Sequence, residues 1–336
     1  MSVNPFAGGG GRQPDEIDLG DGRVIVLRQP EAGPRQPGPA QPGVPPPGTR
    51  FRPRPSLPGP RLAWVVFLFF ATVVSTFMVQ TSVTPEGEIR WQDGLLYAGG
   101  IMTILVCHEL GHFFQARRYH VPASLPIFLP MPLSPIGTLG ALILMRPRVA
   151  RTREMFDIAI SGPLAGLVPT FLCLLIGLPQ STVVPTVHDP GVPELGEPLA
   201  VQWLVRAFFD VPEGHTLLIG PLAFAGWVGL LITALNLLPV AQLDGGHIMY
   251  TLARQRAFQI SAVLLLAAAL GMIVTGYWAW TLMIVLLLIF GIRHPPLADD
   301  PVPDDLGLPR RILGWVTLIV SAVLFLTPMP FQMPDL

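Results

Sequence analysis

Long apolar stretches, separated by polar or proline-rich segments, dominate the chain after residue 61. There are seven of them, at 62–81, 94–116, 156–178, 217–239, 257–276, 278–292 and 312–327. A helix needs about 20 residues to cross the hydrocarbon core of a bilayer, within a range of about 17 to 25. The first five stretches meet that length, and the last two are shorter. The pattern predicts an all-α polytopic membrane protein with about seven transmembrane helices.

Two connections between these stretches depart from a simple loop. Residues 121–146 are apolar but contain five prolines, a density that excludes a helix. Non-helical backbone at membrane depth persists only where it is buried in protein or lines a cavity. We therefore predict a membrane-embedded re-entrant hairpin, with a β-like strand at 137–143. The segment 197–212 has helical apolar spacing and is predicted to lie flat on the outer membrane surface.

The first 60 residues contain 14 prolines and 11 glycines, which is typical of a disordered segment. We interpret 1–60 as a Pro/Gly-rich disordered cytoplasmic tail, with one short strand-forming run at 23–28. The first thirty residues do not contain the charged start, apolar core and cleavage site of a signal peptide.

Charge supports a membrane location and fixes an orientation. Charged residues make up only 13% of the chain and hydrophobic residues 51%, too few charges to cover a soluble surface of this size. The net charge of −1 gives no indication of nucleic-acid binding.

With the N-terminus in the cytoplasm, only Arg90 and Arg206 among the 21 arginines fall outside, as the positive-inside rule requires. Cys107 and Cys173 lie in apolar runs and are read as small buried side chains.

The second apolar stretch ends in the sequence His108-Glu109-Leu110-Gly111-His112. Residues four apart lie on one face of a helix, so His108 and His112 present their imidazoles one turn apart. Two neutral imidazoles supply half of a tetrahedral zinc site, and Glu109 stands beside them as a general base. Polar residues inside an apolar span are costly, which makes a structural explanation of this spacing weak.

A catalytic zinc needs a third protein ligand and an open position. Asp157, at the start of the third stretch, is one candidate. Asp244 is the better one, because it follows the cytoplasmic end of the fourth stretch and so shares a depth with His112. Pro239 and the glycine pair after Asp244 break the helix and can turn the carboxylate inward.

Together these motifs resemble the site-2 protease family of intramembrane zinc metalloproteases. The resemblance rests on His108-Glu109-x-x-His112 and on N-x-x-P-x-x-x-L-D-G at 236–245. The sequences GTLGA at 137–141 and SGPLAG at 161–166 are also similar to that family, especially to its plastid and photosynthetic-bacterial branch. The resemblance covers roughly 94–256. The connection 179–216 is too short for the PDZ domain of some members, and no CBS module follows.

The resemblance implies a Zn2+ ion held by His108, His112 and Asp244, with Glu109 as the catalytic base. It makes residues 61–256 a membrane protease core and 257–336 additional C-terminal transmembrane helices. The implied activity is hydrolysis of peptide bonds in or near the transmembrane segments of single-span membrane proteins, as in regulated intramembrane proteolysis. A bacterial cytoplasmic membrane, with the N-terminus inside, is the expected location; the partners are these substrates and the lipid bilayer.

Other polar residues near the motifs leave two interpretations each. Asn236 is either a donor that stabilises the oxyanion or an amide that packs two helices. His247 is either a partner of the ligating carboxylate or an interfacial polar residue. The small residues of 161–166 indicate close helix packing. His188, His215 and His294 are predicted to be solvated loop residues.

Three rival functions remain. A prenyl-protein peptidase would need a helix-borne glutamate ligand further along the chain, and no fitting one follows. A metal transporter would need ionisable residues repeated through several helices, whereas here they cluster at one depth. The third rival is a catalytically inactive family member that acts as a scaffold for membrane proteins, against which the intact Glu109 argues.

Overall fold

The structure is a computed structural model that describes residues 16–18, 24–26, 61–83, 88–145, 147–186, 194–240, 242–276, 281–290, 294–299, 305–325 and 331–332. The chain divides into two compact units, Met1–Pro53 and Arg54–Leu336. In the first unit, β1 (Glu16–Asp18) pairs antiparallel with β2 (Val24–Val26), which lies inside the predicted strand-forming run. The rest of the predicted disordered tail, 1–60, lies outside the described residues.

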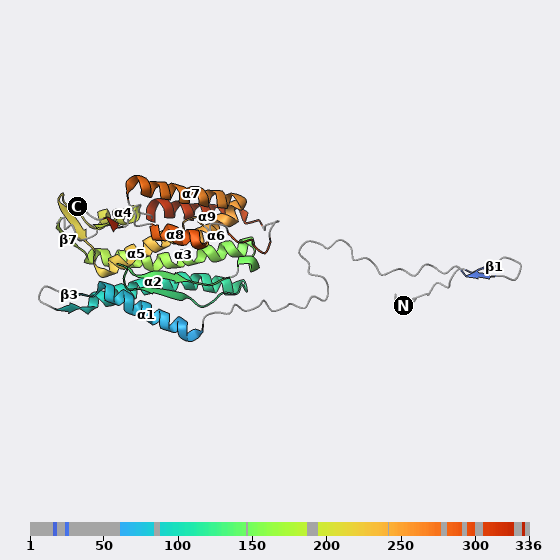
Figure 1. Cartoon of the computed structure of the whole chain (residues 1–336), viewed down its shortest axis with the longest axis horizontal. Helices are drawn as coiled ribbons and strands as arrows, with labels where there is room; N and C mark the ends of the chain where they lie inside the picture. Colours follow the sequence, from blue (N-terminus) through green and yellow to red (C-terminus); the bar gives the residue numbers. More distant parts are fainter. Residues whose placement is uncertain are drawn as a thin grey trace, which may run out of the picture. The chain divides into compact units, whose positions relative to one another are not determined.

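The second unit is built mainly of helices that run side by side (Figure 1). In chain order they are α1 (Leu62–Gln80), α2 (Trp91–Arg118), α3 (Thr152–Gly177), α4 (Leu199–Phe208), α5 (Pro221–Asn236), α6 (Asp244–Ala253), α7 (Gln255–Thr275), α8 (Thr281–Phe290) and α9 (Gly307–Val320). A turn of π-helix, Ser321–Phe325, extends α9. The helices α2, α3 and α5 form the centre of this unit, because they pack against one another along their lengths.

Five helical segments of the described chain are long and apolar enough to cross a membrane: Leu62–Gln80, Trp91–Arg118, Thr152–Gln180, Arg256–Thr275 and Gly307–Phe325. The predicted stretch 217–239 differs, because its first residues belong to a strand and only the 16 residues of α5 are helical. Of the predicted stretch 278–292, the described helix is the 10-residue α8. The seventh stretch, which we expected to be short, belongs to a span of 19 residues.

Short two-stranded sheets occupy the connections. They pair β3 (Ser82–Val83) with β4 (Ile89–Arg90), β5 (Ile127–Met131) with β6 (Gly137–Leu142), β7 (Thr182–Pro185) with β9 (His215–Leu218), and β8 (Glu194–Leu195) with β10 (Phe331–Gln332), all antiparallel. The predicted strand at 137–143 is observed as β6. The predicted amphipathic segment 197–212 contains the helix α4.

The partner strand β5 was not predicted, because it contains Pro130. The pairing of β5 with β6 shifts register between Phe128 and Pro130, and an irregularity of this kind is where a strand tolerates proline. The β5–β6 hairpin is attached to the helices by two hydrogen bonds: Ser75 Oγ donates to the Gly137 carbonyl at 2.6 Å, and the Tyr97 hydroxyl donates to the Ile136 carbonyl at 2.7 Å. The hairpin therefore lies against α1 and α2.

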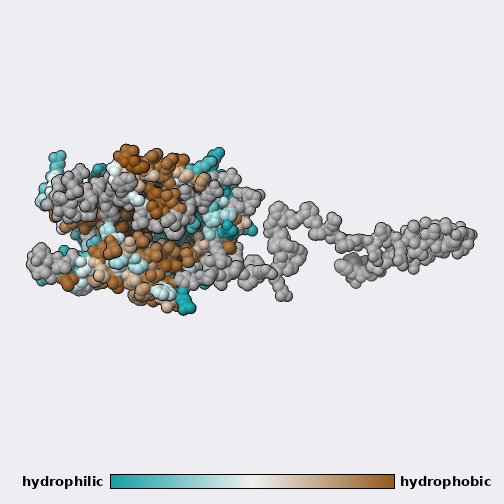
Figure 2. Space-filling view, viewed as in Figure 1, coloured by the Kyte–Doolittle hydropathy of each residue, from teal (hydrophilic) through white to brown (hydrophobic). Residues whose placement is uncertain are grey.

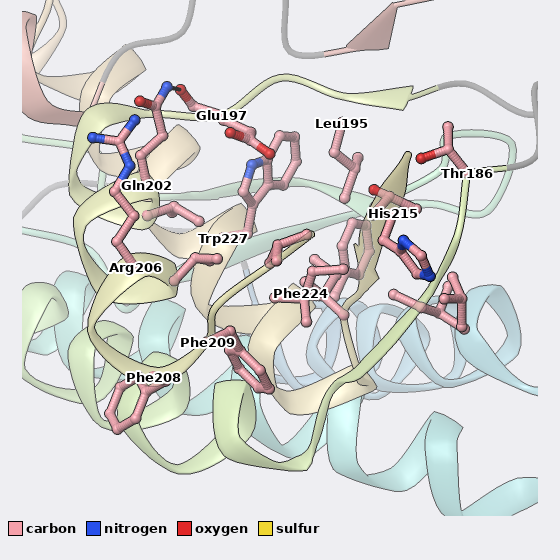
Figure 3. Close-up of a pocket in the computed structure, with 18 of the residues that line it drawn as sticks. Thr186, Leu195, Glu197, Gln202, Arg206, Phe208, Phe209, His215, Phe224 and Trp227 are labelled. Carbon is pink, nitrogen blue, oxygen red and sulfur yellow. Dashed lines mark hydrogen bonds between the residues drawn. The ribbon is translucent and has the colours of Figure 1, made fainter. Parts of the chain in front are cut away.

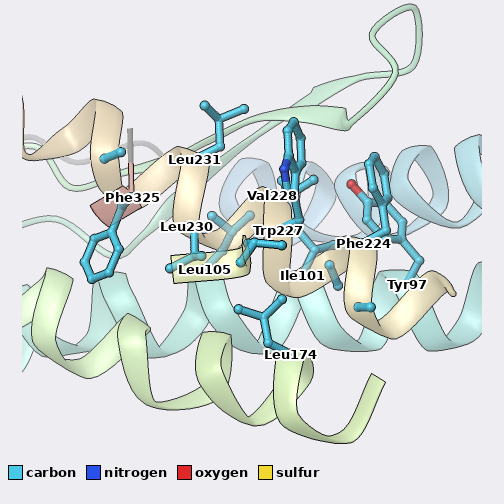
Figure 4. Packing of buried hydrophobic residues seen from close by; sticks show 14 of the residues in the cluster. Tyr97, Ile101, Leu105, Leu174, Phe224, Trp227, Val228, Leu230, Leu231 and Phe325 are labelled. Carbon is cyan, nitrogen blue, oxygen red and sulfur yellow. The ribbon is translucent and has the colours of Figure 1, made fainter. Parts of the chain in front are cut away.

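The largest buried cluster joins α2, α3 and α5 (Figure 4). Tyr97, Ile101 and Leu105 from α2 meet Leu174 from α3 and Trp227 from α5. The rings of Phe224 and Trp227 are stacked with centroids 5.8 Å apart. This cluster makes α5 a fixed partner of α2, which determines where the end of α5 lies.

The outer faces of the helices are apolar. Figure 2 shows hydrophobic residues over the middle of the helical unit and hydrophilic ones toward its two ends. Large hydrophobic side chains such as Phe67, Phe70 and Met78 on α1, and Leu266 and Ile273 on α7, are exposed. An exposed apolar belt of this extent is what a lipid environment requires.

Candidate metal centre

Helix α2 carries His108, Glu109 and His112 into the interior of the helical unit. Their exposed fractions are 3%, 3% and 9%. The imidazole centroids of the two histidines lie 5.0 Å apart, as expected for side chains one helical turn apart. The predicted H-E-x-x-H helix is therefore observed, with its polar side chains removed from solvent.

The connection between α5 and α6 brings Asp244 to the two histidines. Helix α5 ends at Asn236, Pro239 lies in the short link, and Asp244 is the first residue of α6. The glycine pair after Asp244, which we expected to break a helix, lies in the first turn of a new one. A side chain added at Gly245 would overlap the carbonyl of Leu237, so only glycine permits this close return of the chain.

The three predicted ligand atoms form a nearly equilateral triangle. His108 Nε2 lies 3.1 Å from Asp244 Oδ2, His112 Nε2 lies 3.2 Å from the same oxygen, and the two Nε2 atoms lie 3.2 Å apart. Donors bound at about 2.0–2.1 Å to a tetrahedral zinc ion are separated by about 3.3 Å. The donor set and its spacing therefore fit a zinc ion with its fourth position open.

A backbone carbonyl fixes the orientation of His112. Its Nδ1 lies 2.7 Å from the Ile158 carbonyl oxygen, which can only accept, so Nδ1 carries the proton. In the neutral ring the lone pair is then on Nε2, which faces His108 and Asp244. Sequence reasoning missed this contact, because a main-chain oxygen leaves no signature in the residue pattern.

Helices α2 and α3 approach closely through small residues, as the run 161–166 predicted. Ser161 Oγ donates to the Gly111 carbonyl at 3.0 Å. A side-chain carbon added at Gly162 would overlap the imidazole of His112, and one added at Gly166 would lie 3.1 Å from Cβ of His108. The backbone of α3 thus forms the wall against which both imidazoles rest.

Two further polar groups complete the surroundings of the triangle. Glu109 Oε2 is buried and has no hydrogen-bond partner within the described chain. A buried carboxylate oxygen without a partner is costly, and it leaves an acceptor available to a water molecule. Asn236, at the end of α5, places Nδ2 3.4 Å from His108 Nε2. The predicted catalytic and oxyanion residues therefore lie beside the predicted ligands.

His247, on the same helix as Asp244, is buried and forms a pair with the half-buried His294 from the segment after α8. His247 Nδ1 lies 2.6 Å from His294 Nε2, and the His294 ring stacks on Tyr250 with centroids 4.1 Å apart. Burial lowers the pKa of His247 to about 4 and that of His294 to about 3, which keeps both rings neutral. Our prediction that His294 is solvated was wrong, because tertiary contacts with α6 take the place of water.

Two of the other predicted residues are placed elsewhere. Asp157, the alternative third ligand, accepts hydrogen bonds from the Tyr119 hydroxyl at 2.5 Å and from Arg310 at 2.7 and 2.9 Å. It serves to tie α3 to α9 and to the end of α2. His215 is exposed, as predicted, but begins strand β9 instead of lying in a loop, and His188 lies outside the described residues.

A cavity of about 1420 Å³ opens at the other end of α5 (Figure 3). Helix α4, the β7–β9 sheet and the first turns of α5 enclose it, with Phe224 and Trp227 among its lining residues. Asn236 is nine residues beyond Trp227, about 14 Å along a helix. The cavity is therefore separate from the ligand triangle, and its lining includes none of the predicted site residues.

Comparisons with known proteins agree with these motifs. The family model described as Peptidase family M50 matches residues 96–275. Relatives include the probable zinc metalloprotease EGY2, chloroplastic, of Arabidopsis thaliana, 33% identical over 71% of this chain and 43% of its own length. EGY1 of Oryza sativa subsp. japonica is 35% identical over 46% of this chain and 28% of its own length. EGY3 of Oryza sativa subsp. indica is 27% identical over 77% and 45%. The chain thus spans less than half the length of these relatives.

The contact between Gly162 and His112 predicts a selective defect. In Gly162→Ala, the added methyl must displace the imidazole of His112, because the α3 backbone is fixed by packing. We expect zinc affinity, measured by chelator competition, to fall about 10-fold or more. The matched control is Gly99→Ala on α2, where an added carbon meets nothing within 4 Å. Equal zinc affinity in both variants would contradict the assigned position of His112.

Proposed function

Because the chain belongs to peptidase family M50, we propose that it is an intramembrane zinc metalloprotease that cleaves membrane proteins in or near their transmembrane segments. The single observation that carries the proposal is the triangle of the buried His108 and His112 with the half-buried Asp244, beside which the buried Glu109 lies. The names of the relatives as probable zinc metalloproteases support the same chemistry.

In this proposal His108, His112 and Asp244 hold the zinc ion. When bound, zinc lowers the pKa of a coordinated water and polarises the carbonyl of the scissile peptide. The protein contributes a fixed set of two imidazole nitrogens and one carboxylate oxygen, largely removed from solvent. The hydrogen bond from His112 Nδ1 to the Ile158 carbonyl keeps that imidazole in the tautomer that can ligate.

Glu109 acts as the general base. Its free carboxylate oxygen accepts a proton from the attacking water and then delivers it to the leaving amine nitrogen. Asn236 is the candidate donor to the developing oxyanion, because its amide lies within 3.4 Å of His108 Nε2. Exclusion of bulk water by the surrounding helices strengthens both interactions.

The proposed substrates are single-span membrane proteins. In a transmembrane helix the peptide groups are engaged in intrahelical hydrogen bonds. The helix must therefore unwind before a carboxylate-activated water can reach a peptide bond. The β5–β6 hairpin, at membrane depth, offers strand edges to the unwound chain, which gains main-chain hydrogen bonds by β-augmentation. Such pairing satisfies polar backbone groups on both sides in an apolar setting.

The proposed orientation has the N-terminus and the zinc site toward the cytoplasm of a bacterial cell. Its support is the distribution of arginines together with the position of His112 two turns from the end of α2, which closes with Arg117 and Arg118. The cavity lined by Phe224 and Trp227 then lies toward the outer face. The relatives reported above are named as chloroplastic.

A catalytically inactive scaffold is the alternative function. It shares the fold and the binding of membrane proteins but requires no base. The retained Glu109, buried and without a partner in the described chain, favours the protease, because a scaffold gains nothing from the cost of burying that oxygen. Proteolysis by the intact chain would distinguish the protease from the inactive scaffold.

The zinc site and the base predict two different defects. The full chain should bind about one zinc ion, and Asp244→Ala should lose most of it, measured by metal analysis after gel filtration. Normal zinc in Asp244→Ala would reassign the third ligand.

Glu109→Gln should keep zinc but lower proteolysis at least about 100-fold, because an amide cannot accept the proton. Turnover by Glu109→Gln would require another base.

Accessibility of single cysteines tests the orientation. In a background without Cys107 and Cys173, His120→Cys lies after the end of α2 and His215→Cys lies on β9, and both positions are exposed. We expect an impermeant thiol reagent, applied to intact cells, to label position 215 and not position 120. Opening the cells should expose position 120. The opposite pattern would invert the proposed topology.

Substrate binding by the β5–β6 hairpin is testable at Leu142, an exposed residue of β6. Leu142→Pro removes one N–H from the strand, whereas Leu142→Ala retains it. We expect the proline variant to slow cleavage of a membrane-embedded substrate more than cleavage of a short unfolded peptide. Equal slowing of both substrates, or none, would mean that the hairpin is only structural packing.

A further inference from the structure

A short segment beyond the family-matched residues binds the helices that carry the site. We call residues 294–299 the clasp; it follows α8 in the chain, whereas the family match ends at residue 275. The clasp contacts α6 at its first residue and α3 at its last residues. It therefore bridges α6, which carries Asp244, and α3, against which the imidazoles of His108 and His112 rest.

The first contact of the clasp is with α6. His294 Nδ1 lies 2.6 Å from the Pro295 carbonyl oxygen, so Nδ1 is the protonated nitrogen. His294 Nε2 then accepts, and His247 Nδ1 donates to it across 2.6 Å. The stacking of His294 on Tyr250 adds a second contact with the same helix. One clasp residue thus holds two successive turns of α6.

The second contact of the clasp is with α3 and the residues before it. The Ala298 N–H donates to the Ala150 carbonyl at 2.9 Å. Asp299 Oδ2 accepts from the N–H of Thr152 at 3.1 Å and from its hydroxyl at 2.7 Å. The side chain of Leu297 is buried in the cluster that contains Ile158, whose carbonyl orients His112.

We propose that the clasp positions Asp244 for metal binding by holding α6 in register with α3, and that His294 is the residue through which it acts. The inference rests on the zinc site of the proposed function. His294 is a positioning residue, because its contacts reach Asp244 only through His247 and Tyr250.

The need for such a device follows from the shape of α6. This helix has 10 residues, and an isolated helix of that length is marginal. Its ligand is its first residue, where fraying is greatest, and a ligand displaced by more than about 0.5 Å no longer fits the site. Most of α6 is buried, and Ile248 and Met249 pack in a cluster with residues of α3, while His247 and Tyr250 contact His294 of the clasp. Apolar packing is non-directional, whereas a hydrogen bond has a preferred geometry, so the contact of His294 with His247 orients α6 about its axis.

Zinc affinity of the full chain in detergent tests this role. We expect His294→Ala to raise the zinc Kd about 10-fold, measured by competition with a chelator of known affinity. His294→Gln should restore most of the affinity, because its side-chain oxygen can accept from His247. The matched control, His215→Ala, removes an exposed histidine on β9 and should bind zinc as the wild type does.

Two further readouts separate positioning from general loss of structure. The metal-free form of His294→Ala should keep the Tm of the metal-free wild type, and its Co2+ absorption spectrum should change, because the ligand geometry changes. Unaltered zinc affinity in His294→Ala overturns the role of the clasp. An equal loss of zinc affinity in the alanine and glutamine variants, accompanied by a lowered Tm, overturns it as well. A wild type that binds no zinc overturns the proposed function itself, whereas wild-type zinc binding with an unaffected His294→Ala overturns the clasp alone.

Discussion

The close approach of α2 and α3 is the constraint on which the rest of the site depends. Two helices at ordinary separation leave room for side chains between them, and imidazoles in that space can adopt several rotamers. Here Gly162 and Gly166 bring the α3 backbone directly against both histidines, and the Ile158 carbonyl accepts the hydrogen bond from Nδ1–H of His112. Small residues in membrane helices therefore act on chemistry as well as on packing.

Much of the helical fold was predictable, because the length and composition of an apolar run reflect the thickness of the bilayer. The rule failed where hydropathy does not distinguish a helix from a strand. The run 217–239 contains the end of β9 as well as α5, and the Gly220-Pro221 pair that separates them is the only local sign. Strand β5 was missed for the opposite reason, since Pro130 is tolerated at an irregular pairing that only the partner strand defines.

The residues of the candidate site also differ in how well the sequence predicted them. His108 and His112 were predictable together because the helical repeat fixes their relation, and Asp244 followed from its motif. The sequence already favoured Asp244 over Asp157, but it did not predict the partners of Asp157, which are Tyr119 and Arg310. His294 left no signal at all, because a histidine in a proline-containing loop reads as solvated until the chain folds back onto α6. Local patterns thus identify donors, whereas the groups that orient them come from distant parts of the chain.

The length of α5 has a consequence for the surrounding lipid. Sixteen helical residues extend about 24 Å, roughly 6 Å less than the hydrocarbon core of an average bilayer. Such hydrophobic mismatch is relieved by a locally thinner bilayer or by a polar vestibule above the short helix, at a cost of fractions of a kcal/mol for each Å. Asn236 stands at the end of this helix, so for an α5 that crosses the bilayer a local thinning would bring headgroup water toward Asn236 and the neighbouring Glu109. A helix shorter than its membrane would thus give the single water consumed in each hydrolysis a short route to a site that the other helices close to bulk water.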